Sequence, residues 1–253
     1  MKYFSYVSKL VFESTRTIAL LILSAMLFVC GALAQTTQNG LVRPRILGIA
    51  HVAIDVNDLR AASAFYSQVL GFQTPFSLQR STGEDWIAYV KINDQQHVEL
   101  FANSSRPDGA FDHIAFSTDD LASMRRYLIS RGIKIARDIH QGRTGDTFLS
   151  INDPDKRLIE IVEYKAGSWT AQERAKGGNA DHISHVAVPG GLTNAARYFY
   201  QNVLGFEPVP ATNGTDLRMP GEADYIEFPA GVSQVNESCA VFLVSNKSLC
   251  MRP

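Results

Sequence analysis

The chain has only three cysteines and two tryptophans among 253 residues, and its 24 basic and 25 acidic residues leave a net charge of −1. So few cysteines exclude a disulfide framework, although Cys239 and Cys250 could form one bond in an oxidising compartment. The balanced charge excludes a nucleic-acid footprint and an electrostatic membrane patch. Long apolar runs are scarce too, since the run over residues 18–29 is shorter than the roughly 20 residues that a transmembrane helix needs.

The N-terminal apolar run has the context of a secretory signal. It follows three basic residues and precedes the small-residue sequence Ala32-Leu33-Ala34. We therefore expect a signal peptide over 1–34 and an exported protein, periplasmic or secreted, whose N-terminal sequencing would begin at Gln35. An uncleaved anchor is the alternative; without one, no membrane association is expected. The polar segment 35–45 predicts a disordered leader.

Two stretches of the chain repeat one another. "HVAIDVNDLRAASAFYSQVLGF" begins at His51 and "HVAVPGGLTNAARYFYQNVLGF" begins at His185, and half of their positions are identical. A repeat at this separation indicates that one supersecondary unit is used more than once. In the first copy, apolar alternation predicts a strand, Asp58 can cap a helix and Gly71 can end it. Three strand-like runs follow, over 74–79, 86–92 and 97–102.

A more diverged copy begins at His113. It predicts a helix over 124–130 and then strands over 134–138, 147–151 and 158–164. The copy that begins at His185 ends in a strand over 225–228, and a further copy near Cys239 is incomplete.

These copies predict an α+β fold made of strand–helix–three-strand units. We expect one complete domain over 46–165, a linker over 166–180 and a second, partial domain over 181–253.

The first two copies carry a histidine in their first strand and a glutamate in their last strand. These residues are His51 and Glu99 in one copy and His113 and Glu160 in the other. Strand parity places each glutamate opposite its apolar neighbours, so all four side chains share one face of the sheet. Such groups are costly to desolvate unless they are paired or bound to a metal. Two histidines and two glutamates suit one divalent ion, such as Zn, Ni, Mn, Co or Fe.

The remaining histidines and the aromatic residues lead to simpler expectations. His97 and His140 have no counterpart in the repeat, so we expect both at the surface, and we expect His182 in the linker. Tyr89 and Phe101 are candidates for lining a cavity, although aromatics at strand spacing often belong to the core.

The motif that starts at His51 resembles the first glyoxalase I signature. The matching residues are His51-Val52-x-Ile54-x-Val56, then Ala61, Phe65-Tyr66 and Leu70-Gly71-Phe72. The chain thus resembles the vicinal oxygen chelate superfamily, which includes glyoxalase I, methylmalonyl-CoA epimerase, fosfomycin and bleomycin resistance proteins and extradiol dioxygenases. The resemblance covers 46–164 well and the region from 182 onward in part. It departs from glyoxalase I at Phe111-Asp112, where small residues or histidine are usual.

The resemblance implies a fold and a site. It implies paired βαβββ modules that form an open half-barrel around one metal, with His51, Glu99, His113 and Glu160 as the ligands. Glu99 or Glu160 would then be the catalytic base of a lyase or isomerase that acts on a substrate with vicinal oxygens.

Two other functions stay open. His51, His113 and Glu160 would equally form the two-histidine, one-carboxylate face of a non-haem iron, extradiol-type dioxygenase. A binding protein that sequesters a small molecule, of the bleomycin-resistance type, is the third. Export makes a lactoylglutathione lyase the less attractive member of the lyase class.

The C-terminal copy keeps His185 and Glu227 but lacks a second such pair, and alignment of the repeats puts Cys239 where His113 stands. We therefore expect this region to be structural, packing against the first domain or across a homodimer.

Overall fold

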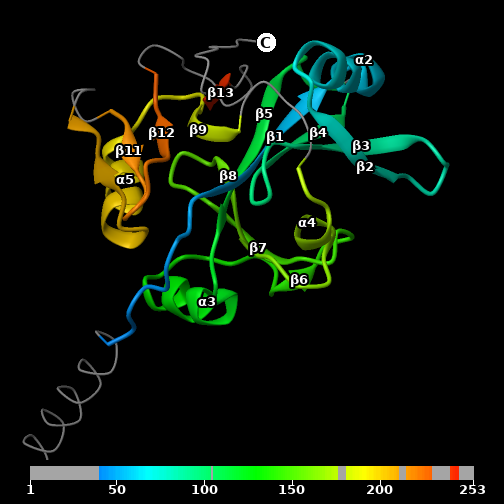
Figure 1. Cartoon of the computed structure of the whole chain (residues 1–253). Coiled ribbons are helices and arrows are strands. Elements are labelled where there is room, and N and C mark those ends of the chain that lie inside the picture. The colour runs from blue at the N-terminus through cyan, green and yellow to red at the C-terminus, as the bar shows by residue number, and fades with distance from the viewer. Residues whose placement is uncertain (1–39, 104, 176–180, 211–214, 230–239, 245–253) are drawn as a thin grey trace, which may run out of the picture. The chain divides into compact units, whose positions relative to one another are not determined.

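Figure 1 shows a computed structural model of the chain, in which residues 40–103, 105–175, 181–210, 215–229 and 240–244 are described. The predicted signal peptide, the last part of the predicted linker, Cys239 and Cys250 lie outside the described residues. Among the helices described, none has the length and apolar character needed to cross a membrane.

An eight-stranded mixed sheet is built from the first two copies of the repeat, in the order β2-β3-β4-β1-β5-β8-β7-β6 (Figure 1). Two antiparallel strands, β1 and β5, lie at its centre, and each pairs on its other side with the parallel last strand of its own copy, β4 or β8. The strands are β1 (Ile49–Val56), β2 (Gln73–Gln79), β3 (Asp85–Lys91), β4 (His97–Ala102), β5 (Ala110–Ser117), β6 (His140–Gln141), β7 (Thr147–Asn152) and β8 (Leu158–Glu163).

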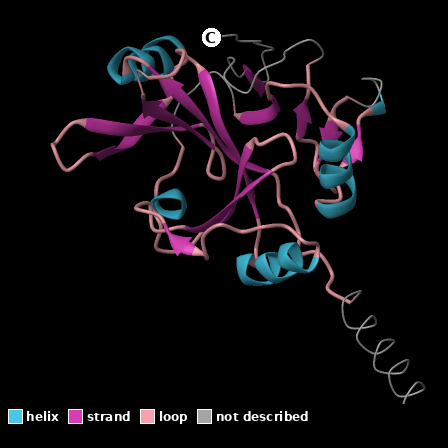
Figure 2. Cartoon of the chain, turned by 180° about the vertical axis from the view of Figure 1, so that it is seen from behind, coloured by secondary structure: helices cyan, strands magenta, loops and turns pink. Residues whose placement is uncertain are grey.

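Two longer helical segments lie on the outer side of these strands, as Figure 2 shows. Helix α2 (Leu59–Ala64) begins at Asp58, whose carboxylate accepts a hydrogen bond from the Ala61 nitrogen at 2.9 Å. It continues as the π-helix η1 (Phe65–Val69). Helix α3 (Leu121–Ser130) begins at Asp120 and ends before Gly132, whose φ of +78° is a left-handed conformation that suits glycine.

A second, five-stranded sheet has the order β10-β11-β12-β9-β13. This order reproduces that of β2-β3-β4-β1-β5, so the sheet corresponds to one copy of the repeat plus the first strand of another. The prediction of one complete and one partial domain is therefore confirmed for the described residues. The complete domain, with the eight-stranded sheet, is called the first module below, and the partial domain, with the five-stranded sheet, is called the second module. The elements are β9 (His182–Ala187), α5 (Asn194–Tyr198), the π-helix η2 (Phe199–Val203), β10 (Glu207–Pro208), β11 (Leu217–Arg218), β12 (Tyr225–Glu227) and β13 (Ala240–Val244).

The two sheets share one apolar core and a buried cation. The core cluster includes residues of both, and the Phe116 and Phe206 rings meet edge to face at 5.3 Å. Arg157, in the turn between β7 and β8, is buried; it donates to the Pro189 and Gly191 carbonyls of the second module and pairs with Asp153 at 2.7 Å. A buried guanidinium is tolerated because these groups use its donors.

Two connecting segments differ from the structure expected for them. The predicted strand over 134–138 is wrong, because Ile133 and Ile135 pack on the core while the pairing with β7 is confined to β6. The predicted linker begins with the short helix α4 (Trp169–Gln172), whose Trp169 and Thr170 are buried. The domain boundaries themselves stay predictions.

Candidate metal centre

The four central strands β4, β1, β5 and β8 bring the four predicted ligands together. In one row across the sheet, His51 pairs with Ala115, and Ala115 pairs with Glu160. In the next row, Ala53 pairs with both Glu99 and His113. Each histidine is thus separated from the glutamate of the other copy by a single alanine, whose small side chain leaves room for the longer ones.

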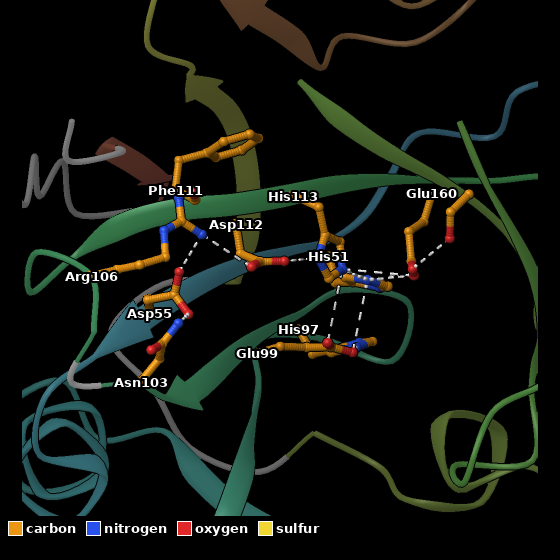
Figure 3. A network of polar contacts seen from close by, with 11 residues as sticks. His51, Asp55, His97, Glu99, Asn103, Arg106, Phe111, Asp112, His113 and Glu160 are labelled. Carbon is orange, nitrogen blue, oxygen red and sulfur yellow. Dashed lines mark hydrogen bonds and ion pairs between the residues drawn. The ribbon is translucent and has the colours of Figure 1, made fainter. Parts of the chain in front are cut away.

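The ligand atoms of these side chains converge, as Figure 3 shows. The Nε2 atoms of His51 and His113 lie 3.1 Å apart. Glu160 Oε2 lies 3.7 Å from both nitrogens. The Glu99 oxygens lie 3.8 Å from His51 Nε2 and 3.9 Å from His113 Nε2.

A divalent ion fits this donor set. Two imidazole nitrogens bound to one ion at about 2.1 Å and a right angle would be about 3 Å apart, close to the separation of the two Nε2 atoms. Among the described residues, His51, Glu99 and His113 form a group whose ligand atoms all lie within 4.8 Å of one another. Their exposed fractions are 4%, 8% and 4%, so the charges that they carry need a buried counter-charge.

His113 is oriented by a carboxylate next to it in the chain. Its Nδ1 lies 2.7 Å from Asp112 Oδ1, and because a carboxylate only accepts, Nδ1 carries a proton, so that Nε2 is the nitrogen that can bind a metal once the ring is neutral. Arg106 holds the other Asp112 oxygen at 3.2 Å and Asp55 at 2.5 Å (Figure 3). The departure from the glyoxalase I signature at Asp112 thus supplies a partner of the kind that metal-binding histidines use.

Burial and neighbouring charges set the pKa values in opposite directions. Burial alone would lower the pKa of His113, but the hydrogen bond to Asp112 and the charges of Glu160 and Glu99 raise it to about 9. Burial raises the pKa of Glu99. For Glu160, the effect of burial is outweighed by the nearby imidazoles of His51 and His113, so its pKa is lowered. Burial lowers the pKa of His51.

The expectation that His97 lies at the surface is wrong. Its exposed fraction is 3%, its ring stacks on His51 with 4.7 Å between centroids, and its Nε2 lies 3.3 Å from Glu99 Oε1. Burial, and then the charge of Lys91, lower its pKa to about 3. The repeat could not reveal His97, because the equivalent position of the second copy is Leu158. Strand parity could have, since residues 97 and 99 point to the same face.

The expectations for two other histidines also need correction. His140 is half-buried and lines a cavity, where its ring lies 3.9 Å from that of Phe148. His182 opens strand β9 rather than lying in a linker, and its Nε2 lies 2.6 Å from Asp224 Oδ1.

The cavity beside the four ligands has a volume of about 330 Å³. All four of the predicted ligands line it, together with His97. Tyr89 and Phe101, the two candidates named from the sequence, line it too, although Tyr89 also belongs to a buried apolar cluster; Leu78, Trp86 and Ile87 add further apolar wall. Arg143, which also lines the cavity, is exposed. A small molecule with an apolar body therefore fits beside the four candidate metal ligands.

The second module brings together fewer such groups. His185 Nε2 lies 3.8 Å from Glu227 Oε2, and the His185 ring stacks on Tyr225 at 4.4 Å. In the pairing of β13 with β9, Ala240 faces Ala187 as His113 faces Ala53, so the position of His113 is taken by Ala240 and not by Cys239 as the alignment suggested.

Known proteins share this fold and sequence pattern. The profile of the Glyoxalase/Bleomycin resistance protein/Dioxygenase superfamily matches residues 48–161. The uncharacterized protein YaeR of Escherichia coli is 30% identical over 122 residues, which cover 46% of this chain and 95% of YaeR. A probable lactoylglutathione lyase of Vibrio parahaemolyticus is 27% identical over 128 residues, covering 47% of this chain and 93% of that protein.

Two solved structures resemble a larger part of the chain. The Mn(II)-bound glyoxalase from Novosphingobium aromaticivorans has a TM-score of 0.54 at 20% identity and covers 74% of this chain and 63% of its own. A catechol 2,3-dioxygenase has a TM-score of 0.55 at 17% identity and covers 79% of this chain and 75% of its own. At these identities the likeness is one of fold alone. From the matching profile, the similarity to YaeR and the shared fold, we conclude that the chain belongs to the Glyoxalase/Bleomycin resistance protein/Dioxygenase superfamily.

Proposed function

We propose that this chain is a metal-dependent lyase or isomerase that acts on a small substrate with two neighbouring oxygens. One observation carries the proposal: two imidazole nitrogens 3.1 Å apart face carboxylate oxygens from two glutamates at 3.7–3.9 Å, in the wall of a cavity. Four protein ligands of this kind favour redox-neutral chemistry, because three of them would be enough for an oxygen-activating iron site.

Each residue of the site has a part in the proposed reaction. His51, Glu99, His113 and Glu160 would hold the ion, which when bound polarises the substrate oxygens and stabilises negative charge near them. Glu99 or Glu160 takes the proton from the carbon beside a substrate carbonyl and returns it, so that the substrate passes through an enolate-like state. The apolar wall that includes Ile87 and Phe101 limits the access of water.

A dioxygenase is the second candidate, and one distance favours it. A single oxygen of Glu160 lies 3.7 Å from both imidazole nitrogens, whereas Glu99 approaches the two nitrogens with different oxygens. His51, His113 and Glu160 therefore resemble the two-histidine, one-carboxylate arrangement of non-haem iron enzymes.

Metal analysis combined with proton exchange tests the proposal. The purified full-length chain is loaded anaerobically with Ni, Zn, Co, Mn or Fe, its metal content is measured, and deuterium uptake from D2O into small α-hydroxyketones is followed by NMR. We expect one ion per chain and exchange that needs no oxygen. Of the variants Glu99→Gln and Glu160→Gln, the one that removes the base should abolish exchange, whereas Glu84→Gln, in an exposed turn, should not.

The other outcomes separate the alternatives. Iron-dependent oxygen uptake with catechols would favour the dioxygenase. A chain that binds no metal would refute both enzymes and leave the small-molecule-binding protein.

A further inference from the structure

His97 is a buried polar residue beside the candidate metal centre that belongs to neither the repeat nor the predicted ligand set. It lies two residues before Glu99 on β4, and its cross-strand neighbour on β1 is His51. Its ring is packed on three sides: it stacks on His51, and it meets the Trp169 and Tyr89 rings with 5.6 Å between centroids. A ring so enclosed has little rotational freedom.

The contact between His97 and Glu99 fixes which atom carries the proton. Nε2 lies 3.3 Å from Glu99 Oε1, and since the carboxylate of Glu99 is ionised when it serves as a metal ligand and can then only accept, Nε2–H is the donor in that state. His97 Nδ1 is buried and has no hydrogen-bond partner among the residues that the structure describes. With its Nε2 engaged in this way, His97 is placed to hold a ligand rather than to act as one, and it is not a member of the group formed by His51, Glu99 and His113.

Glu160 is held in the same manner by a different donor. Ser150 Oγ donates to Glu160 Oε1 at 3.1 Å, so Oε2 is left facing the two histidines. Ser150 is the cross-strand partner of Glu160, and the corresponding partner of Glu99 is Tyr89. The first copy thus has an aromatic residue where the second has a hydroxyl donor, and the imidazole of His97 supplies the hydrogen bond instead.

We propose that His97 is a positioning residue, which holds one oxygen of Glu99 through Nε2–H so that the carboxylate is fixed in place before the ion binds. This inference rests on the proposed metal site. Hydrogen bonds to a ligand carboxylate orient it, and the loss of such a partner commonly weakens metal binding about 10- to 100-fold.

The inference extends to the segment that follows the first module. Trp169 of α4 covers His97, and Lys91, the cross-strand partner of His97, donates from Nζ to the Thr170 carbonyl at 2.7 Å. Helix α4 therefore closes the cavity wall behind the imidazole. Residues 169–172 lie beyond the range 48–161 that the superfamily profile matches, so this cover is an addition to the part of the chain that the profile describes.

Replacing His97 by glutamine or by asparagine, whose side chains differ by one methylene, tests whether His97 positions Glu99. The glutamine amide of His97→Gln can reach the place of Nε2, whereas the shorter amide of His97→Asn reaches only the place of Nδ1. The affinity of each full-length variant for Co(II) is measured by competition with a chelator, together with the visible absorption of the bound Co(II). The thermal unfolding of the metal-free proteins is recorded alongside.

We expect His97→Gln to stay within about threefold of the wild-type affinity and to keep its spectrum. His97→Asn should lose about tenfold or more and show an altered Co(II) band, with similar thermal unfolding of both metal-free variants. Equal affinities for the wild type, Gln and Asn forms would overturn the inference, and so would equal losses in both variants. A wild-type chain that binds no Co(II) would instead overturn the proposed function.

Discussion

Asp112 illustrates how a residue that binds no metal can decide how well a site binds one. It accepts a hydrogen bond from His113 Nδ1 and is itself held by Arg106, which also pairs with Asp55. The chain of contacts thereby links β1, the segment before β5, and β5 itself. Its effect is to select one tautomer of the neutral His113 ring that binds a metal, the one with the proton on Nδ1 and the lone pair on Nε2.

Substitution of Asp112 should therefore weaken metal binding in a graded way. Asn keeps an acceptor but loses the charge, whereas Ala loses both. We expect the affinity to fall in the order wild type, Asp112→Asn, Asp112→Ala, with the last about 10- to 100-fold below the first in chelator competition. Asp119→Asn is the control, because the charged partner of Asp119 among the described residues is the exposed Arg45, at 3.8 Å. An Ala variant with wild-type affinity would contradict the role of Asp112.

At the scale of elements, the features that could be predicted from the sequence are those encoded by neighbouring residues or by the repeat. The alternation from His51 predicted β1, Asp58 and Gly71 marked the limits of the helical segment, and the matching positions of the two copies predicted which four side chains would meet. Short-range patterns encode strand faces and helix caps, so they can be read directly.

What the sequence could not reveal depends on segments far along the chain. His97 is buried because α4 covers it, and the distance in sequence between them carries no periodic signal. The segment 134–138 alternates like a strand, yet Ile135 packs on the core and the pairing with β7 begins only beyond the segment, at His140. Such outcomes are decided by which surfaces remain free once the sheet has formed.

Helix α4 should contribute stability despite its length of one turn. Trp169 is 9% exposed and stacks on Phe76 at 5.4 Å, in a cluster with Tyr89 and His97. We expect Trp169→Ala to lower the free energy of unfolding by about 3–5 kcal/mol in urea titrations. The matched control is the other tryptophan, Trp86, which is only half-buried. Trp86→Ala should therefore lower the free energy of unfolding clearly less. Equal losses in the two variants would show that α4 is not a structural cover.

At the scale of the whole molecule, polar contacts join the two modules. The Gln96 side chain accepts from the Ile183 nitrogen at 2.8 Å and donates to the Ile183 carbonyl at 3.2 Å, as a neighbouring strand would. It also donates to Asp224 at 3.3 Å, and Asp224 in turn binds His182. These contacts agree with the prediction that the C-terminal region packs against the first domain; the homodimer stays a prediction.

The His182–Asp224 pair gives this junction a dependence on pH. The hydrogen bond to Asp224 raises the pKa of His182 above 6.5, and the charges of Asp181 and Glu222 add to the rise. A pKa that is higher in the folded state stabilises the fold fully below about pH 6.5, and this stabilisation is lost as the pH rises through the folded pKa.

We therefore expect the wild type to be more stable than His182→Gln at pH 6, and the difference to shrink towards pH 9. Urea unfolding midpoints of the two proteins across this range measure it, and their subtraction cancels the titration of groups common to both. A difference that is constant with pH, or that grows, would contradict the assignment.

The contacts of Arg157 affect the order in which parts of the chain can fold during synthesis. It lies in the last hairpin of the first module, but the carbonyls of residues 189 and 191 accept hydrogen bonds from it. The Phe228 ring that it faces lies still later in the sequence. When the ribosome has extruded every ligand of the candidate metal centre, it has also extruded Asp153 and Asp155, which pair with this guanidinium, but not yet the two carbonyls that accept its other hydrogen bonds. Until these carbonyls arrive, their donors must stay in water, so the turn between β7 and β8 is expected to be the last part of the first module to reach its final structure.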